Sequence, residues 1–248
     1  MKIALLIPCT SKGRPWKTIT ETYFYTLTFK TFLLTHDKEH EYHFYLGVDH
    51  DDPVFNNLVE QQKIQKFNTI YKNIHIHFIP LNVEKGYLTK MWNIIFLKAY
   101  QDSCDYFYQC GDDINFKTTG WVNDSISILE QHNNIGLTGP INNNNYILTQ
   151  AFVSRKHMEI FGYFFPENII NWGCDDWYNF VYKPDYFFPL SKHYCSNEGG
   201  NPRYVIDRKP GFTKQYKKNV EELRQRTQSQ GTRDRIKILQ YLKLVNIT

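Results

Sequence analysis

Two pairs of adjacent aspartates are the residues of this 248-residue chain whose types and spacing best suit chemistry. The first pair, Asp112 and Asp113, follows YFYQC (106–110) after one glycine, Gly111, and YFYQC is a stretch typical of a buried strand. Asp is a poor strand residue and an unpaired buried charge is costly, so we expect a positive partner beside this pair. Carboxylate oxygens suit Mg²⁺ or Mn²⁺, which proteins often share with substrate phosphates. A solvated acidic turn is the competing interpretation of the pair alone.

The elements that must position this pair follow from the alternation of two patterns. Apolar, partly β-branched runs predict strands at 2–8, 41–49, 73–81 and 104–110, and helical spacing predicts helices at 18–36, 52–67 and 87–101. Such alternation indicates an α/β fold with a parallel sheet, in which ligands bind beyond the carboxyl ends of the strands. Asp49 and the pair Asp112–Asp113 each follow a strand, so we expect them at the same edge.

The second half of the chain has a less regular pattern. It predicts a helix at 119–132, a short strand at 135–139, a strand and then a helix within 146–162, and a helix at 171–184. The stretch INNNNY (141–146) is expected to be a polar loop, placed where an acceptor could pass. His75 and His77 alternate along the strand 73–81, and we expect them to be ordinary face residues rather than ligands. From about Gly211 we expect two amphipathic helices, separated at Gly231.

Composition excludes several classes of protein. The hydrophobic content of 42% and the charged content of 22% are ordinary for a soluble globular protein. The five cysteines form no CxxC pair, which favours neither a zinc knuckle nor a disulfide framework and suggests a reducing compartment. The N-terminal apolar run is too short for a signal peptide, so a cytoplasmic location is expected. No GxGxxG follows a strand, which disfavours a dehydrogenase or a methyltransferase.

The basic residues are concentrated at the end of the chain. From Arg208 onward there are 11 Lys and Arg against 3 Asp and Glu, whereas the preceding residues carry 18 against 22. Helices that pack back on the preceding domain are the preferred interpretation of this tail, and peripheral contact with an anionic membrane is the second. Nucleic acid is not an expected partner, because no recognised binding motif accompanies the charges.

Several local sequences, in this order, resemble the GT-A fold of nucleotide-sugar glycosyltransferases, in particular the inverting family 2 group. They are LLIPCTSKGRPW after the first strand, YLGVDHDDP after the second, LNVEKGYLTKMWN at a helix entry, and YFYQCGDDI. The last corresponds to the DxD motif of that family but has Cys110 or Gly111 at the first acidic position. The resemblance covers roughly residues 2 to 200.

The resemblance implies a GT-A catalytic domain over 1–207, with a nucleotide-sugar half (about 1–115) and an acceptor half (about 116–207), followed by a basic helical extension over 208–248. It implies a Mn²⁺ or Mg²⁺ ion held by Asp113, with His193 in LSKHYCSNEGG as the second metal ligand. It also implies donor contacts from Pro8, Thr10, Arg14, Asp49, Lys90 and Asp112.

The second aspartate pair lies in WGCDDW (172–177), which resembles the acceptor-side block of the same family. There a carboxylate acts as the general base, and we expect Asp176 first and Asp175 second in that role. The expected activity is an inverting, metal-dependent transfer of sugar from a nucleotide-diphosphate donor, expected to be UDP-linked, to a hydroxyl of a carbohydrate or glycoconjugate acceptor. A sugar nucleotidyltransferase would need a Gly-rich loop, and PCTSKGRPW has one Gly. A non-catalytic carbohydrate- or nucleotide-sugar-binding module is the remaining alternative.

Overall fold

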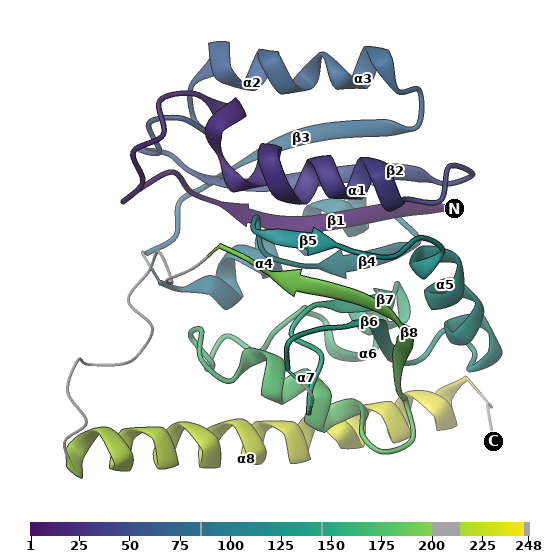
Figure 1. Ribbon diagram of the computed structural model, residues 1–248. Coiled ribbons are helices and arrows are strands. Elements are labelled where there is room, and N and C mark those ends of the chain that lie inside the picture. Colours follow the sequence, from purple (N-terminus) through teal and green to yellow (C-terminus); the bar gives the residue numbers. More distant parts are fainter. Residues whose placement is uncertain (85, 145, 200–213, 246–248) are drawn as a thin grey trace.

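The computed structural model describes residues 1–84, 86–144, 146–199 and 214–245, and within them eight strands form one sheet (Figure 1). The strand order is β3-β2-β1-β4-β7-β6-β8-β5. The first four in that order are parallel to one another: β3 (Ile74–Leu81), β2 (Glu41–Asp49), β1 (Lys2–Cys9) and β4 (Tyr106–Gln109). The expected α/β class and the strands of the first half are confirmed.

The second half of the sheet is mixed. Strand β7 (Ala151–Ser154) is antiparallel to both β4 and β6 (Leu137–Ile141), while β8 (Phe187–Asn197) is parallel to β6. The short strand β5 (Ile114–Phe116) pairs antiparallel with the end of β8. This pairing brings the end of β8 to the segment that follows β4, although some 80 residues separate the two in the sequence.

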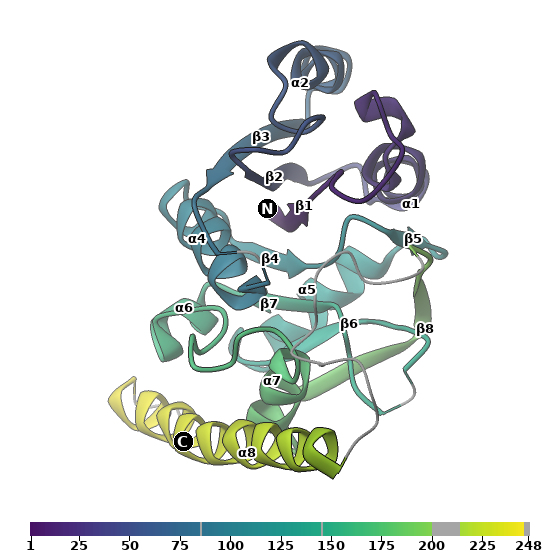
Figure 2. The same cartoon turned by 90° about the vertical axis from the view of Figure 1, so that its left-hand side faces the viewer.

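Helices cover both faces of the sheet (Figure 2). One face is covered by α1 (Lys30–Thr35) with the segment before it, and by α5 (Trp121–Gln131). Helix α2 (Leu58–Gln65) and the short α3 (Phe67–Ile70) pack on the same face. Their side chains form one core, which includes Phe24, Phe32, Ile64 and Trp121. On the other face lie α4 (Leu88–Gln101), α6 (Lys156–Phe161) and α7 (Cys174–Tyr182). All five cysteines are buried and free, as the absence of CxxC pairs suggested.

The helix predicted over 18–36 is divided into three parts. A 3₁₀ turn (Ile19–Glu21) precedes a π-helical segment (Phe24–Phe29), and α1 follows it directly. Threonine hydroxyls donate hydrogen bonds to the carbonyls of preceding turns, for example from Thr26 to Thr22 at 2.8 Å and from Thr31 to Leu27 at 2.7 Å. Such bonds compete with regular helix geometry, and a pattern of apolar spacing does not register them.

The two helices predicted for the tail are one helix, α8 (Lys214–Leu244), and the expected break at Gly231 is wrong. Gly231 lies where α8 meets α7, and a β-carbon there would be 2.5 Å from Cδ1 of Phe180. The glycine is therefore explained by close packing rather than by a helix end. The domain boundary predicted at 207/208 lies outside the described residues.

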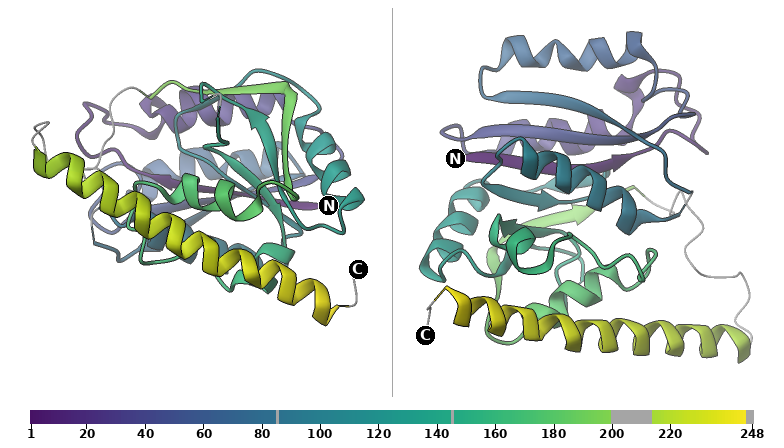
Figure 3. Two further views of the ribbon diagram at one scale, coloured as in Figure 1. Left: turned by 90° about the horizontal axis from the view of Figure 1, so that it is seen from below. Right: turned by 180° about the vertical axis from the view of Figure 1, so that it is seen from behind.

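The described part of α8 packs against α6 and α7, as the left panel of Figure 3 shows. Ile238 belongs to the core, and the buried Asp234 accepts a hydrogen bond from the indole nitrogen of Trp177 at 3.0 Å. The preferred interpretation of the tail, helices packing back on the domain, is therefore correct for these residues. Among the helices of the described residues, none combines the length and apolar character needed to cross a bilayer.

Candidate active site

The carboxyl ends of β1, β2 and β4 meet at one edge of the sheet, the left-hand edge in Figure 1. The parallel register pairs Cys9 with Val48, and Leu6 with Gln109, so the three segments that follow these strands are neighbours. Thr10 and the pair Asp112–Asp113 lie in these segments, and Asp49 is the last residue of β2. The sequence-based expectation that these residues share an edge is met.

A buried carboxylate, Asp52, fixes the segment after β1 to the segment after β2. Its oxygens accept hydrogen bonds from the Ser11 amide at 2.7 Å, the Ser11 hydroxyl at 2.6 Å and the Thr10 hydroxyl at 3.0 Å. They also accept bonds from the backbone amides of Val54 and Phe55. The sequence did not indicate this role, because Ser11 and Thr10 lie 41 and 42 residues from Asp52.

Asp49, the predicted donor contact on β2, faces Lys12 from the first segment. The ammonium of Lys12 lies 3.1 Å from Oδ2 of Asp49 and also pairs with Asp51. Lys12 is a second residue that sequence reasoning missed. Its cation stands at the edge where a donor phosphate or a carboxylate would need a positive partner.

The two members of the first pair have different surroundings. Asp112 is completely buried, whereas Asp113 is half-buried. The carboxylate of Asp113 is held between two glycines: a β-carbon at Gly111 would lie 2.5 Å from its Oδ1, and one at Gly199 would lie 1.9 Å from its Oδ2. Side chains at these positions would displace the carboxylate, so the chain leaves room for it from both β4 and the end of β8.

Arg14 completes this part of the edge. Its guanidinium donates a hydrogen bond to the carbonyl of Gly199 at 2.8 Å and lies over the rings of Trp16 and Tyr23, 5.8 and 5.3 Å from their centroids. The structure thus brings together Arg14 and Asp113 around Gly199. Arg14 is a positive group near the pair, and its hydrogen bond to the Gly199 carbonyl holds it beside Asp113.

The predicted second metal ligand, His193, is not brought to Asp113. Its Nε2 lies 2.8 Å from Oδ2 of Asp124 on α5, and its Nδ1 lies 3.2 Å from the hydroxyl of Thr118. In the strand register Asn197, four residues further along β8, is the residue that pairs with Ile114 next to Asp113. At about 3.3 Å per residue, His193 is on the order of 13 Å away along the strand. A metal-ligand role for His193 does not fit this geometry, because both ring nitrogens bind α5 and the loop before it.

Lys90, on the first turn of α4, lies apart from the aspartates. Its ammonium is 3.9 Å from Glu167 and 5.1 Å from the centroid of the Tyr87 ring. It lines a pocket of about 290 Å³ with Asn82, Val83, Glu84 and Glu167. No contact in the described residues joins Lys90 to Asp112 or Asp113, so a phosphate contact from it stays a prediction.

The second aspartate pair occupies the first turn of α7, and its two members face different neighbours. Helix α7 follows Gly173, whose φ of 87° is in the left-handed region that favours glycine. Asp176 is exposed and lines a pocket of about 330 Å³ with residues of α8, among them Arg224 and Thr227. Asp175 is half-buried, and burial, together with the charge of Asp176, raises the pKa of Asp175 to about 6.

Asp175 shares a helical face with Tyr178, one turn later. The hydroxyl of Tyr178 lies 3.4 Å from Oε1 of Gln109, the last residue of β4 and the third before Asp112. The face of α7 that carries Asp175 and Tyr178 is therefore the one directed to the end of β4. A carboxyl group with a pKa of about 6 is largely ionised at neutral pH and can accept a proton there.

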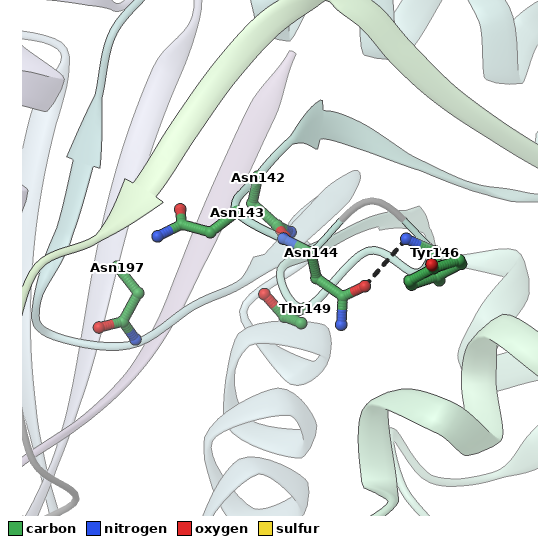
Figure 4. Close-up of a pocket in the computed structure, with 6 residues that line it drawn as sticks. All are labelled: Asn142, Asn143, Asn144, Tyr146, Thr149 and Asn197. Carbon is green, nitrogen blue, oxygen red and sulfur yellow. Dashed lines mark hydrogen bonds between the residues drawn. The ribbon is translucent and has the colours of Figure 1, made fainter.

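A polar pocket of about 460 Å³ opens beside the end of β8 (Figure 4). It is lined by Asn142, Asn143, Asn144, Tyr146, Thr149 and Asn197. Two hydrogen bonds stabilise the loop that lines the pocket. The side-chain oxygen of Asn144 accepts from the Tyr146 amide at 2.9 Å, and the side-chain oxygen of Asn143 accepts from the hydroxyl of Tyr194 on β8 at 3.3 Å. The sequence predicted a polar loop here but did not indicate Asn197, which reaches the pocket because β8 pairs with β6, whose last residue Ile141 lies opposite Tyr194.

The chain is similar in structure to solved forms of S. aureus TarS. One TarS structure matches over 78% of this chain with a TM-score of 0.55 and 12% identity. TarS 1–349 in complex with UDP-GlcNAc matches over 82% of the chain with a TM-score of 0.55 and 13% identity, and TarS 1–349 in complex with UDP matches over 79% with a TM-score of 0.52. The chain spans 36% of the length of the first of these proteins and 60% of the 1–349 form.

At this level of identity the likeness establishes the fold, which is the GT-A-like arrangement that the sequence motifs suggested. No protein-family model matches the chain, and neither does any curated protein. The roles of individual residues therefore have to be argued from the geometry described above.

Proposed function

We propose that this chain is an inverting, metal-dependent glycosyltransferase that takes a sugar from a UDP-linked donor and passes it to a hydroxyl of a carbohydrate or glycoconjugate acceptor. The observation that supports the proposal is that Asp113 follows β4, whose last residue Gln109 contacts Tyr178 on the face of α7 that carries Asp175, in a fold shared with a protein solved in complex with UDP-GlcNAc. Under this proposal the two carboxylates do different work.

Asp113 is proposed as the residue that holds Mn²⁺ or Mg²⁺. The donor set fits, because a half-buried carboxylate clamped between Gly111 and Gly199 offers the hard oxygen ligand that these ions prefer. When bound, the cation would neutralise charge that develops on the departing diphosphate. The donor itself would supply further oxygen ligands, so His193 is not required.

Thr10, Arg14 and Asp49 are proposed to hold the nucleotide part of the donor, with Pro8 shaping the start of their loop. Asp52 fixes this loop through three hydrogen bonds to Thr10 and Ser11, so that its groups are in place before the donor arrives. Lys12 and Arg14 bring positive charge to the same edge. Because Asp112 is completely buried, its contact with the donor stays a prediction.

Asp175 is proposed as the general base, in preference to Asp176. The acceptor hydroxyl loses its proton to the Asp175 carboxylate while its oxygen forms a bond to the anomeric carbon. The bond from that carbon to the diphosphate oxygen breaks, and the electron pair leaves with UDP. Attack from the face opposite the leaving group inverts the anomeric centre. A base with a pKa of about 6 suits this task at neutral pH.

The asparagine-lined pocket is proposed to receive the acceptor. Amide side chains offer both donors and acceptors for sugar hydroxyls, and the exposed ring of Tyr146 offers an apolar face with a polar edge. Contact of the basic α8 with an anionic membrane remains a further prediction for a membrane-linked acceptor.

A turnover experiment tests the proposal. Release of UDP from a panel of UDP-sugars is measured with Mn²⁺, with and without simple glycoside acceptors, and NMR of the product reports its anomeric configuration. The account expects acceptor-dependent UDP release and an inverted product. Binding of UDP without turnover of any donor would instead support the non-catalytic nucleotide-sugar-binding module, and a retained configuration would contradict the role given to Asp175.

A further inference from the structure

Glu41, His43 and His75 form a compact cluster at the opposite edge of the sheet, near the amino ends of β2 and β3. Each offers one ligand atom, and these three atoms lie within 4.8 Å of one another. Glu41 and His43 lie two residues apart on the same face of β2, and the parallel register sets His43 beside His75. The rings of His43 and His75 stack with centroids 4.6 Å apart.

One of the two distances from Glu41 to the histidines matches a small tetrahedral ion, and the other is a hydrogen-bond distance that the ion would lengthen. Oε1 of Glu41 is 2.7 Å from Nε2 of His43 and 3.3 Å from Nε2 of His75. Zinc bonds to nitrogen and oxygen are about 2.0–2.2 Å long, which places tetrahedral ligand atoms about 3.3–3.6 Å apart. A shift of about 1 Å by the exposed Glu41 side chain would open the triangle to that size.

The chemistry of the three ligands also selects the ion. Two imidazoles and one carboxylate are a zinc-type set, whereas Mg²⁺ and Mn²⁺ favour oxygen ligands. The side chains of His75 and Glu41 are 31% and 49% exposed, which leaves a path for the ion and a fourth position open to water.

Further groups orient the buried ligand, as the outer partners of metal sites commonly do. Nδ1 of His43 lies 2.9 Å from Nε2 of His77, whose ring stacks on Tyr45, and the Tyr45 hydroxyl donates to Asp102 at 3.0 Å. Lys2 is the cation that faces the cluster, and it donates to the carbonyl of Asp102 at 2.7 Å. This hydrogen bond directs the Lys2 ammonium toward Asp102.

We propose that Glu41, His43 and His75 bind one Zn²⁺ ion that links β2 to the edge strand β3, with His77 positioning His43. The site is separate from the carboxyl edge that carries Asp113, and it does not depend on the proposed activity. His75 was expected to be an ordinary face residue because its partners are 32 and 34 residues away in the sequence. Bound zinc would hold the edge strand in place and so stabilise the folded chain.

Titration with Zn²⁺ and with Co²⁺ as a spectroscopic substitute tests the site. The proteins are the wild type, Glu41→Gln, His75→Gln and Asp113→Asn, with His132→Gln as a matched control on the far side of the sheet. The account expects one Zn²⁺ per chain in the wild type, His132→Gln and Asp113→Asn, a visible Co²⁺ band of the four-coordinate kind, and a rise in Tm on adding Zn²⁺.

Either cluster variant should weaken zinc binding by at least about tenfold and abolish the rise in Tm. Because Glu41 and His75 are partly exposed, at least one of the two variants should fold normally, and far-UV circular dichroism checks this. Absence of zinc binding in the wild type would overturn the proposal. So would equal binding in the wild type and in both cluster variants, since the ion would then be held elsewhere.

Discussion

The pair Asp112–Asp113 and the pair Asp175–Asp176 have the same sequence but different backbone conformations. The first occupies the turn between β4 and β5, where one carboxylate is completely buried and the other faces the end of β8. The second opens a helix, where neighbouring side chains point about 100° apart. One of them is directed to the end of β4 and the other to α8.

Under the proposed function, each adjacent pair of acids offers one working carboxylate, and the local backbone decides which one. At the turn it is the second residue, Asp113, and at the helix start it is the first, Asp175. The first is suited to hold a cation because it is fixed and partly exposed. The second is suited to take a proton because burial raises its pKa to about 6.

The largest effect on turnover is expected when Asp175 and Asp176 of the helical pair are substituted one at a time. Asp175→Asn removes the proposed base, so kcat should fall by about 10²–10⁴-fold while the affinity for UDP is unchanged. Asp176→Asn is the matched control and should change kcat by less than about threefold. Steady-state kinetics on both variants check this, and the reverse ranking would restore Asp176 as the base.

The next largest effect, on the affinity for UDP, is expected at Gly199, one of the two glycines that flank the Asp113 carboxylate. Gly199→Ala places a β-carbon against Oδ2 of Asp113 and should lower the Mn²⁺-dependent affinity for UDP by about 10–100-fold, the range seen when the support of a metal ligand is disturbed. The control is Gly162→Ala at the end of α6, which strains a backbone with a φ of 78° but adds a β-carbon with no atom within 4 Å of it. Calorimetry that found equal affinities for the two variants would show that Asp113 is not held in this way.

The pH dependence of turnover should report the ionisation of Asp175 in the helical pair. Asp175 must be ionised to act as a base, and its pKa is raised to about 6, so kcat should fall about tenfold for each unit of pH below 6 and level off above it. Asp176→Asn should keep this limb, with the pKa shifted slightly downward because the neighbouring charge is gone. A pH profile that is flat between 5 and 7 in the wild type would contradict the assignment.

A smaller effect on stability is expected at the start of α7. Gly173→Ala adds a side chain at a φ of 87° and a β-carbon 2.9 Å from the hydroxyl oxygen of Thr227. The free energy of unfolding should fall by about 1–3 kcal/mol. Urea denaturation measures this, and the double variant with Thr227→Ala should recover part of the loss if the contact with α8 matters. No recovery would assign the whole effect to the backbone.

Much of the sheet could be predicted from the sequence, because strands and helices alternate clearly in the first half. The strand predicted at 41–49 is β2 with the same limits, and the helix predicted at 87–101 differs from α4 by one residue. The break predicted at Gly231 was wrong because a glycine can serve packing against Phe180 as well as a helix end. Local patterns do not distinguish these two uses.

The sequence predicted the two acidic pairs of the candidate site, but it did not predict how their side chains are arranged in space. Sequence alone could not order Asp175 and Asp176, because the order depends on what each side of α7 packs against. It could not find Asp52, whose partners come from another strand, or the cluster of Glu41 with two histidines, which exists through strand register. His193 was assigned by its neighbours in the sequence, whereas its ring contacts Asp124 and Thr118.

The central claim is that Asp113 holds a cation against the diphosphate of a uridine nucleotide. Calorimetric titration of UDP, with and without Mn²⁺, on the wild type, Asp113→Asn and Asp176→Asn tests it most directly. We expect Mn²⁺-dependent binding that is lost in Asp113→Asn and kept in Asp176→Asn. Binding of UDP that is equally strong in Asp113→Asn, or that is absent from the wild type with any divalent metal, would contradict it.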